Sequence, residues 1–393
     1  MTLRRPGTQR VFDLAVLGNF LAIGVLLAAV PLHVREDLGG SKAAVGVATS
    51  IFFAAALVAR PVAGRWMDRL GRRPFLVWPL AAMVLLAVAM EATSSVVSVV
   101  VVRLLQGAFG SVFYTACAAV STDLAPADKR AGAVARLSLM IYLGFAFGPF
   151  LGEWLFHQNG RWPWVAAAVL HLAAFGAARL LPETLSTPSV AAVTAASTLR
   201  TYRLVLLPGM AQLCAGLGYS CVVAFLTLYA KEIGLGVAGW LFFTYACSAL
   251  AVRMVSGRLA DRFGYVSVAL PGMVVFAGGH LLMAVAWAPW VPFPAIAMTG
   301  IGFGAVFPAL TALAVSGAPD ADRGAALGTF LSFNDLGNAV AGPVVGSIAD
   351  AAGFRWAYGS PAIVACIGIV FVLALSRGTR RAALLAPARP TVR

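Results

Sequence analysis

The amino-acid sequence predicts an all-α membrane protein of twelve transmembrane helices, arranged as two pseudo-symmetric halves of six. Three observations carry this prediction: the composition, a segment that occurs twice, and a regular succession of apolar runs. Hydrophobic residues make up 61% of the 393 residues and charged residues only 11%, against roughly 45–50% and 25% in an average soluble domain. So little charge cannot solvate the surface of a soluble chain of this length, and we expect the chain to lie in a membrane.

The repeated segment is GRWMDRLGRR at 64–73, which recurs as GRLADRFGYV at 257–266. When residues 58–71 are aligned with 251–264, half of the positions are identical. Each copy lies between two apolar stretches long enough to cross a bilayer. Internal symmetry of this kind in a membrane protein is typical of transporters built from two related halves.

Apolar runs bounded by loop residues give two sets of six expected spans, close to the roughly 20 residues that a helix needs to cross a bilayer. The runs are 11–34, 44–63, 74–92, 96–120, 132–156, 162–181, 204–229, 237–256, 265–288, 290–316, 324–350 and 355–376. They divide the chain into an N-terminal half (1–181), a linker rich in Pro, Ser and Thr (182–203), a C-terminal half (204–376) and a basic tail (377–393).

The distribution of basic residues predicts the orientation. Of the 29 Lys and Arg residues, we place about 23 in the tails, loops and helix ends of one face, Arg60 and Arg253 among them. Because Lys and Arg stay on the cytoplasmic side, we expect a multi-pass protein of the inner (cytoplasmic) membrane with both termini, the linker and the tail in the cytoplasm. The net charge of +14 then reflects topology and contact with anionic membrane lipid, and no nucleic-acid partner is expected.

Catalytic, cofactor and metal motifs are missing from the sequence. There is no phosphate-binding GxxxxGK[ST], HExxH or CxxC, and the five cysteines lie in apolar segments without metal-ligand spacing. We therefore expect no cofactor, no metal and no enzymatic reaction, and a chain that functions as a monomer.

Three motifs make the chain resemble the major facilitator superfamily over its whole length. GRWMDRLGRR resembles the signature loop between spans 2 and 3, RLLQGAFG at 103–110 the span-4 motif, and GFAFGPFLG at 144–152 the span-5 motif of the antiporter and efflux branches. The resemblance implies a secondary active transporter that exports a small organic molecule as protons enter. The alternatives are a proton- or ion-coupled uptake symporter on the same fold and, from another class, a non-transporting receptor or sensor. In one departure from the family pattern, Glu153 follows the span-5 motif where a second Gly is usual.

The repeated loop is interpreted as a gate. In the packing that the resemblance implies, Asp68 faces the start of helix 11 near Arg323 and Gly324, where the helix dipole attracts an anion. Such a contact exists only when the halves close on the cytoplasmic side; a loop that merely sets topology is the alternative. The gating residues of the loop and its repeat are Gly64, Asp68, Arg69, Gly71, Arg72, Gly257, Asp261 and Arg262.

Small residues at every fourth position mark helices 5 and 11, where the repeat continues as 138–152 aligned with 332–346. Small residues at this spacing let two helices approach closely, and a proline opens the local hydrogen-bond ladder. A moving interface that seals an exporter and ordinary close packing both account for the pattern. The residues of this helix-packing motif are Gly144, Gly148, Pro149, Gly152, Gly342, Pro343 and Gly346.

Ionisable groups inside the spans are candidates for proton coupling. Asp335 lies near the middle of span 11, and the matched position of helix 5 is the apolar Ile141. An acid satisfied by interhelical hydrogen bonds is the alternative for Asp335. The resemblance gives Arg103 a role in proton movement, with a structurally paired arginine as the alternative.

Two further acids complete the proton-coupling candidates. Asp13 lies in the first turn of helix 1, where it could equally complement the helix dipole. Glu153 lies near the outer end of helix 5, where a solvated acid at the mouth is the alternative.

Amides and tyrosines in matching helices are expected on the wall of a substrate cavity. Aromatic rings and amides in a largely apolar cleft suit an amphiphilic organic molecule, although the same residues also join helices. The candidates are Asn19, Gln106, Tyr114, Tyr142, Gln212, Tyr219, Tyr245, Asn334 and Asn338.

Overall fold

The computed structural model describes the chain except for residues 1–6, 127–128, 186–194, 320–321 and 386–393. Its helices are α1 (Thr8–Leu32) with the π-helical turn η1 (His33–Asp37), α2 (Lys42–Leu70), α3 (Arg73–Glu91), α4 (Val96–Asp123), α5 (Arg130–Gln158), α6 (Trp162–Arg179), α7 (Ala195–Glu232), α8 (Gly239–Phe263), α9 (Tyr265–Ala284), α10 (Pro292–Ser316) and α11 (Arg323–Leu385).

The predicted fold class is confirmed. Ten of the described helices are long and apolar enough to cross a membrane, with α11 counted once. α11 is two helices joined at Gly353, whose φ of 81° breaks the helical backbone, and α6 adds a shorter helix of 18 residues. When α11 is counted as two helices and α6 is added, the described ranges contain the twelve helices that were expected.

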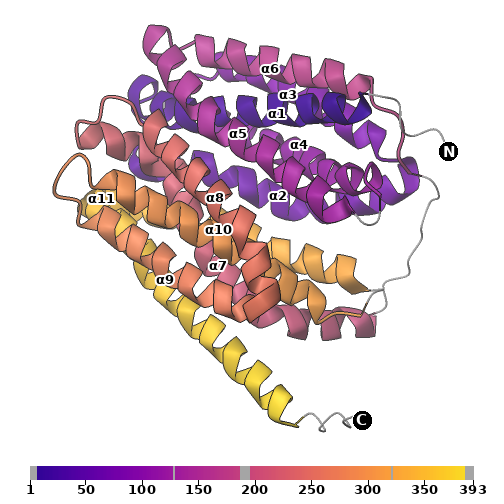
Figure 1. The fold of residues 1–393 in the computed structure, drawn as a ribbon. Coiled ribbons are helices and arrows are strands. Elements are labelled where there is room, and N and C mark those ends of the chain that lie inside the picture. Colours follow the sequence, from indigo (N-terminus) through magenta and orange to yellow (C-terminus); the bar gives the residue numbers. More distant parts are fainter. Residues whose placement is uncertain (1–6, 127–128, 186–194, 320–321, 386–393) are drawn as a thin grey trace.

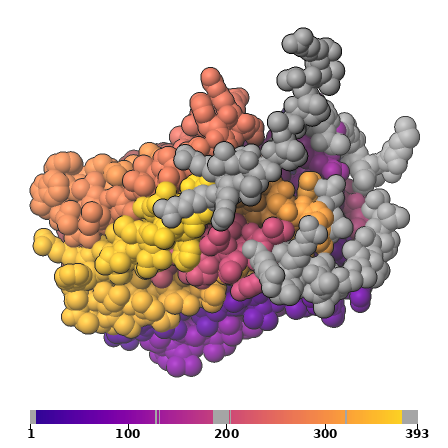
Figure 2. Space-filling view, turned by 90° about the horizontal axis from the view of Figure 1, so that it is seen from below, coloured from indigo at the N-terminus to yellow at the C-terminus, as the bar shows by residue number. Residues whose placement is uncertain are grey.

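The helices form two halves that lie side by side, α1–α6 in indigo to magenta and α7–α11 in pink to yellow (Figure 1). α1 and α7 are the most buried of the spanning helices. The halves meet chiefly along two helix pairs, α2 with α11 and α5 with α8. Seen from below, the C-terminal half covers much of the view and the N-terminal half shows along one edge (Figure 2).

The expected linker and tail are partly helical. α7 begins at Ala195, inside the region 182–203 expected to link the halves, of which 186–194 lies outside the described residues. α11 continues through the expected tail as far as Leu385, and 386–393 lies outside the described residues. The division into these four regions stays a prediction.

The two ends of the bundle differ. We call the end at which α2 begins the capped end, and the end at which α2 gives way to α3 the basic end. At the basic end, Gly71 and Gly264 adopt φ of 93° and 89°, a backbone that residues with a Cβ rarely take. The α2–α3 turn and its repeat between α8 and α9 therefore depend on equivalent glycines.

Near the capped end, α2 and α11 approach each other on small residues. Gly342 donates its backbone N–H to Ser50 Oγ at 2.8 Å, and a Cβ at Gly342 would overlap the carbonyl oxygen of Gly46. Gly346 lies in the same way against Ala43. These glycines join helices of different halves.

The matching glycines of α5 pack inside one half. Gly144, Gly148 and Gly152 lie against α1, and a Cβ at Gly148 would come within 2.6 Å of the Gly24 Cα atom. The repeated motif therefore makes an interface within a half in α5 and an interface between halves in α11. Whether either interface moves stays a prediction.

We expect Gly148→Leu and Gly342→Leu to act differently. A leucine at 148 overlaps the α1 backbone and should prevent the N-terminal half from packing, which lowers folded yield and thermal stability. A leucine at 342 meets only the other half, which can move away, so folded yield should be kept while transport falls. Size-exclusion yield, thermal unfolding and transport rate check this; equal loss of folding in both variants would contradict it.

Candidate functional site

A cavity of about 200 Å³ lies between the two halves. Four helices of each half contribute to its wall, α1, α2, α4 and α5 on one side and α7, α8, α10 and α11 on the other. Aromatic and aliphatic side chains make up most of the lining. A small, mainly apolar chamber between symmetric halves is the usual place for a transported molecule.

Most of the predicted cavity residues lie on this wall. The lining contains Tyr114, Tyr142, Tyr219, Tyr245, Asn334 and Asn338, together with the coupling candidates Asp335 and Arg103. Asn19, Gln106 and Gln212 are fully buried and lie outside the lining. Gln106 accepts a hydrogen bond from Arg103 at 3.0 Å, and Gln212 donates one to Asn334 at 2.9 Å. The part that each residue plays in transport stays a prediction.

An ion pair joins the halves in the cavity wall. Arg60 Nε of α2 lies 3.1 Å from Asp335 Oδ2 of α11, and Asp335 is only 1% exposed. The Arg60 guanidinium also stands 5.1 Å from the centroid of the Tyr114 ring. The carboxylate of Asp335, in the part of α11 before the break at Gly353, is thus held by a cation from the opposite half.

The expected position of Arg60 and Arg253 at the basic end is wrong, because both side chains line the cavity. The guanidinium of Arg253 lies 4.9 Å from the centroid of the Tyr142 ring and 5.6 Å from that of Phe307. The error has a simple cause. The apolar runs end near these arginines, but α2 and α8 continue to Leu70 and Phe263, which leaves roughly three helical turns beyond each arginine.

Arg103 is held by neutral groups of the N-terminal half. It is 4% exposed, donates to the Ala48 carbonyl at 3.3 Å and to Gln106 at 3.0 Å, and stands over the Phe52 ring at 5.0 Å. Among the described residues it has no carboxylate partner.

Asp13 is part of an ion pair between α1 and α5. Its carboxylate accepts from Arg136 Nε at 2.6 Å and from Gln9 at 3.0 Å. Asp13 lies away from the cavity lining, and its predicted share in proton coupling is untested.

At the capped end, two carboxylates cap helices of the opposite half. Glu153 of α5 accepts from the backbone N–H groups of Ala238 and Gly239 at 3.0 and 2.9 Å, where α8 begins. Asp350 of α11 accepts from Lys42 and Ala43 at 2.8 Å each, where α2 begins. Glu153 is 5% exposed, so the solvated position considered for it is wrong. Asp350 is not among the residues predicted from the sequence.

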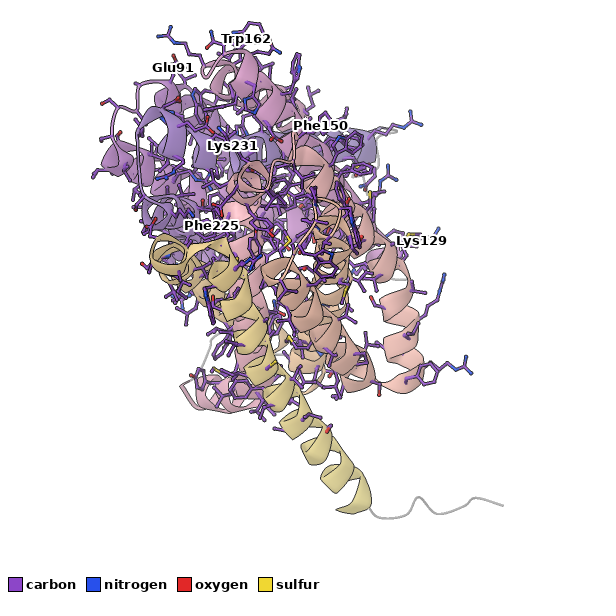
Figure 3. All side chains as sticks on the ribbon, turned by 90° about the vertical axis from the view of Figure 1, so that its left-hand side faces the viewer. Glu91, Lys129, Phe150, Trp162, Phe225 and Lys231 are labelled. Atoms are coloured by element: carbon purple, nitrogen blue, oxygen red, sulfur yellow. The ribbon has the colours of Figure 1, made fainter. Side chains whose placement is uncertain are left out.

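Two ion pairs reinforce this contact. Lys42 lies 3.3 Å from Glu232, and Lys231 lies 2.6 Å from Glu36; each pair joins the two halves. Figure 3 looks onto this end, with Glu91 and Trp162 at the upper edge in the N-terminal half and with Lys231 and Phe150 below them, above Phe225. Polar contacts between the halves therefore close the capped end both at the start of α2 and at the start of α8.

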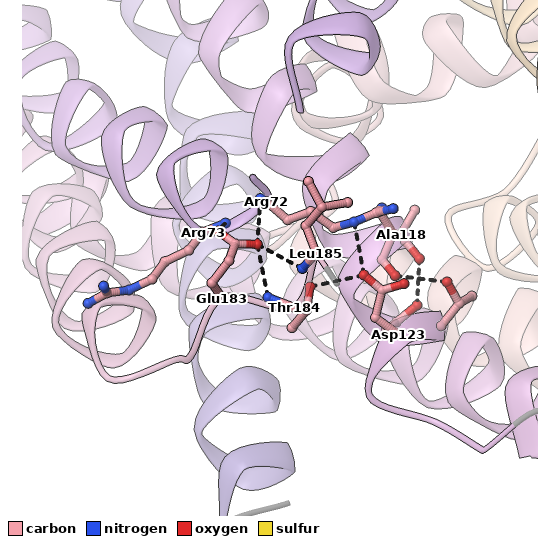
Figure 4. A network of polar contacts seen from close by, with 10 residues as sticks. Arg72, Arg73, Ala118, Asp123, Glu183, Thr184 and Leu185 are labelled. Carbon is pink, nitrogen blue, oxygen red and sulfur yellow. Dashed lines mark hydrogen bonds and ion pairs between the residues drawn. The ribbon is translucent and has the colours of Figure 1, made fainter. Parts of the chain in front are cut away.

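At the basic end, a polar network holds the α2–α3 loop to its own half (Figure 4). Glu183 accepts from the backbone N–H groups of Arg72 and Arg73 at 2.8 and 3.1 Å, at the start of α3. The Arg72 side chain lies 2.9 Å from Asp123, which also accepts from Thr184. Partial burial acts to raise the pKa of Glu183, but its backbone hydrogen bonds outweigh burial and hold the pKa below the usual value.

The predicted contact of Asp68 is not made in this conformation. Asp68 and Asp261 are exposed, and among the described residues Asp68 forms no ion pair. A Cβ placed on Gly64, Gly257 or Gly324 would meet nothing within 4 Å, whereas one on Gly71 would meet Glu183, so open space lies beside the last turns of α2 and α8 and the start of α11. The remaining gating residues, Arg69 and Arg262, are also exposed.

We expect the hold on the α2–α3 loop to weaken in acid. Because the folded pKa of Glu183 is lowered, its stabilising contribution is present above the usual glutamate pKa and is lost as pH falls through the folded value. The protection factors of the Arg72 and Arg73 amides against hydrogen exchange, which correct for the pH dependence of the intrinsic rate, should therefore fall at low pH. Glu183→Gln should show the low protection already at neutral pH; protection that is unchanged in this variant would contradict the assignment.

Comparison with known proteins identifies the family. The family model of the Major Facilitator Superfamily matches residues 12–237 and, again, 208–391. An uncharacterized MFS-type transporter of Pseudomonas aeruginosa is 31% identical over 92% of both chains. The uncharacterized MFS-type transporter YhhS of Escherichia coli K12 is 28% identical over 91% of this chain and 90% of its own.

Solved structures share the fold at low identity. The nucleoside transporter NupG covers 93% of this chain and 99% of its own with a TM-score of 0.80 at 13% identity. The human organic anion transporter MFSD10 covers 94% and 100% with a TM-score of 0.70 at 19% identity. A bacterial homologue of the lysosomal transporter Spinster, in an inward-facing and unoccupied conformation, covers 95% and 98% with a TM-score of 0.76 at 14% identity. The fold and the relatives are those of multi-pass membrane transporters. The chain belongs to the major facilitator superfamily.

Proposed function

We propose that the protein is a secondary active transporter that exports a small organic molecule from the cytoplasm as protons enter, by alternating access. The observation that carries the proposal is the ion pair between Arg60 and Asp335, 3.1 Å apart. It places a proton-titratable group in the wall of the central cavity and across the contact between the halves. Gain or loss of a proton there changes both the charge of the cavity and the attraction between the halves, which is what coupling requires.

The asymmetry of the two ends supports alternating access. Carboxylate caps and ion pairs join the halves at the capped end, whereas at the basic end the last turns of α2 and α8 and the start of α11 stand beside open space. Because Lys and Arg remain in the cytoplasm, we assign the basic end to the cytoplasm and the described conformation to the inward-facing state. In the outward-facing state we expect Asp68 to reach the start of α11. We further propose that the protein works as a monomer in the inner membrane, with its basic end against anionic lipid.

The direction of transport rests on the span-5 motif, GFAFGPFLG at 144–152, which resembles that of antiporters. A second candidate, uptake by symport, is favoured by a different observation. Asp335 already neutralises Arg60, so a proton on Asp335 frees a cation in the cavity and would strengthen the binding of an anion. Proton and anion would then bind together, as a symporter requires.

Everted membrane vesicles separate the two candidates. Cells that express the protein are first screened against a panel of toxic organic compounds, and a compound to which they become more resistant, as export predicts, or more sensitive, as uptake predicts, is then used radiolabelled. An antiporter that exports should accumulate this compound in everted vesicles when the lumen is acidified. A symporter should accumulate it when the outer medium is acidified. Absence of any response to either gradient would refute proton coupling.

A further inference from the structure

The charges of the central cavity are unbalanced. Its described lining carries three arginines and one aspartate, Arg60, Arg103, Arg253 and Asp335, which gives a formal charge of +2 when all four are ionised. Charges inside a membrane protein are costly unless a partner compensates them. The lining therefore lacks negative charge for the arginines that it holds.

Arg253 repeats Arg60 in the other half. The two residues align in the duplicated segment, both reach the cavity, and each guanidinium stands over a tyrosine of the N-terminal half. The distance to the ring centroid is 5.1 Å for Arg60 on Tyr114 and 4.9 Å for Arg253 on Tyr142. The two halves thus present equivalent cations to the same space.

The symmetry ends at the counterion. Arg60 is paired with Asp335 of α11, but the residue of α5 that aligns with Asp335 is Ile141, which also lines the cavity. Among the described residues, Arg253 has no carboxylate in ion-pairing range. Its side chain hydrogen-bonds the neutral Tyr142, and its buried Nε, like that of Arg60, has no hydrogen-bond acceptor. The duplication has kept the arginine and not the acid.

The surroundings of Arg253 suit an organic anion with an aromatic or apolar body. Phe307 lies beside the guanidinium, and Tyr219 stacks on Phe303 with ring centroids 4.8 Å apart. The buried hydroxyl of Tyr245, also in the lining, has no partner among the described residues and can donate to an anionic oxygen. A planar guanidinium binds a carboxylate, sulfonate or phosphate through two parallel hydrogen bonds.

We propose that the transported molecule is a small organic anion whose acidic group binds Arg253, in the place that Asp335 takes at Arg60. The inference rests on the proposed transport function and names its substrate class. Arg103 is a weaker candidate for this role, because its guanidinium is already engaged by Ala48 and Gln106. A cation would add to the excess positive charge, and a neutral molecule would leave Arg253 uncompensated.

Equilibrium binding to the full-length protein in lipid nanodiscs tests the proposal without a proton gradient. The probes share one ring system and differ in charge: naphthoate, naphthalenesulfonate and naphthyl phosphate as anions, naphthamide as the neutral analogue, and naphthylmethylamine as the cation. We expect at least one anion to bind about 10- to 100-fold more tightly than the amide, the worth of a charged hydrogen-bonded contact. Failure of all three anions to bind more tightly than the amide overturns the proposal.

Variants assign the preference to one residue. Arg253→Gln should remove the preference for anions, whereas Arg258→Gln, an exposed arginine of the same helix, should keep it. Ile141→Asp supplies the acid that the repeat lacks, and should also remove the preference, while Ile141→Asn should keep most of it. If Arg60→Gln alone removes the preference and Arg253→Gln does not, the assignment is wrong. Vesicle transport that responds to pH would still stand in that case, so the two proposals fail separately.

Discussion

Asp335→Asn is expected to abolish pH-driven transport while the protein still folds and still exchanges substrate across the membrane. Asparagine keeps the size of the side chain and its hydrogen-bonding atoms, but it cannot release a proton or neutralise Arg60. The cavity charge then no longer changes with pH, so a proton gradient has nothing to act on. Exchange of labelled for unlabelled substrate needs no net proton movement and should persist. Proteoliposomes with an imposed pH gradient, and the same proteoliposomes at equal pH, measure the two activities.

The matched control is Glu91→Gln, which removes an exposed acid outside the cavity that pairs only with Arg161 of its own half, and should leave both activities intact. The double variant Arg60→Gln with Asp335→Asn should be no more damaged than Asp335→Asn alone, because the two residues act through one contact. If Asp335→Asn retains normal pH-driven transport, the acid is a structural partner of Arg60 and the coupling group lies elsewhere.

The fold could be predicted from the sequence because membrane helices are long and apolar, and because each copy of the duplicated loop is a short continuous segment that can be recognised without knowing its contacts. Composition and the repeat were sufficient for twelve helices in two halves. The repeat also contained the signal that identifies Arg60 and Arg253 as a pair, since both positions are arginine in otherwise apolar surroundings. We missed their place in the cavity because hydropathy marks where an apolar run ends, whereas the helix continues beyond it.

The polar contacts at the capped end could not be predicted in the same way. Asp350 and Glu153 act on the first backbone N–H groups of α2 and α8, which are distant in sequence and belong to the other half. A helix N-terminus accepts any suitably placed carboxylate, so no sequence spacing records the pairing. Asp335 differs in one respect, because its position deep in an apolar helix indicated a special role for the residue itself. Its partner, Arg60, became evident only in the folded chain.

Removing both caps, in the double variant Glu153→Gln with Asp350→Asn, is expected to open the capped end and close the basic end. Each carboxylate accepts two backbone hydrogen bonds across the halves, and loss of a helix cap costs about 0.5–2 kcal/mol. Loss of both caps therefore totals about 1–4 kcal/mol, and even about 1–2 kcal/mol changes a two-state population by about 5- to 30-fold. The capped end is the contact that holds the halves in the described conformation, so the population should move toward the opposite one.

Cysteine labelling at two cavity positions measures this shift in a background without the five native cysteines. Leu27 lies toward the capped end of the cavity and Ser138 toward the basic end. Leu27→Cys should become more reactive to a membrane-impermeant maleimide that is added on the capped side. Ser138→Cys should become less reactive to the same reagent when it is added on the basic side. The control is Glu91→Gln, which removes an acid at the capped end that pairs with Arg161 of the same half at 2.8 Å. Because that pair does not join the halves, its loss should leave both reactivities unchanged. Equal labelling in the double variant and in the unaltered protein would mean that the glycine contacts of α2 with α11 close this end by themselves, and that the two carboxylates only terminate helices.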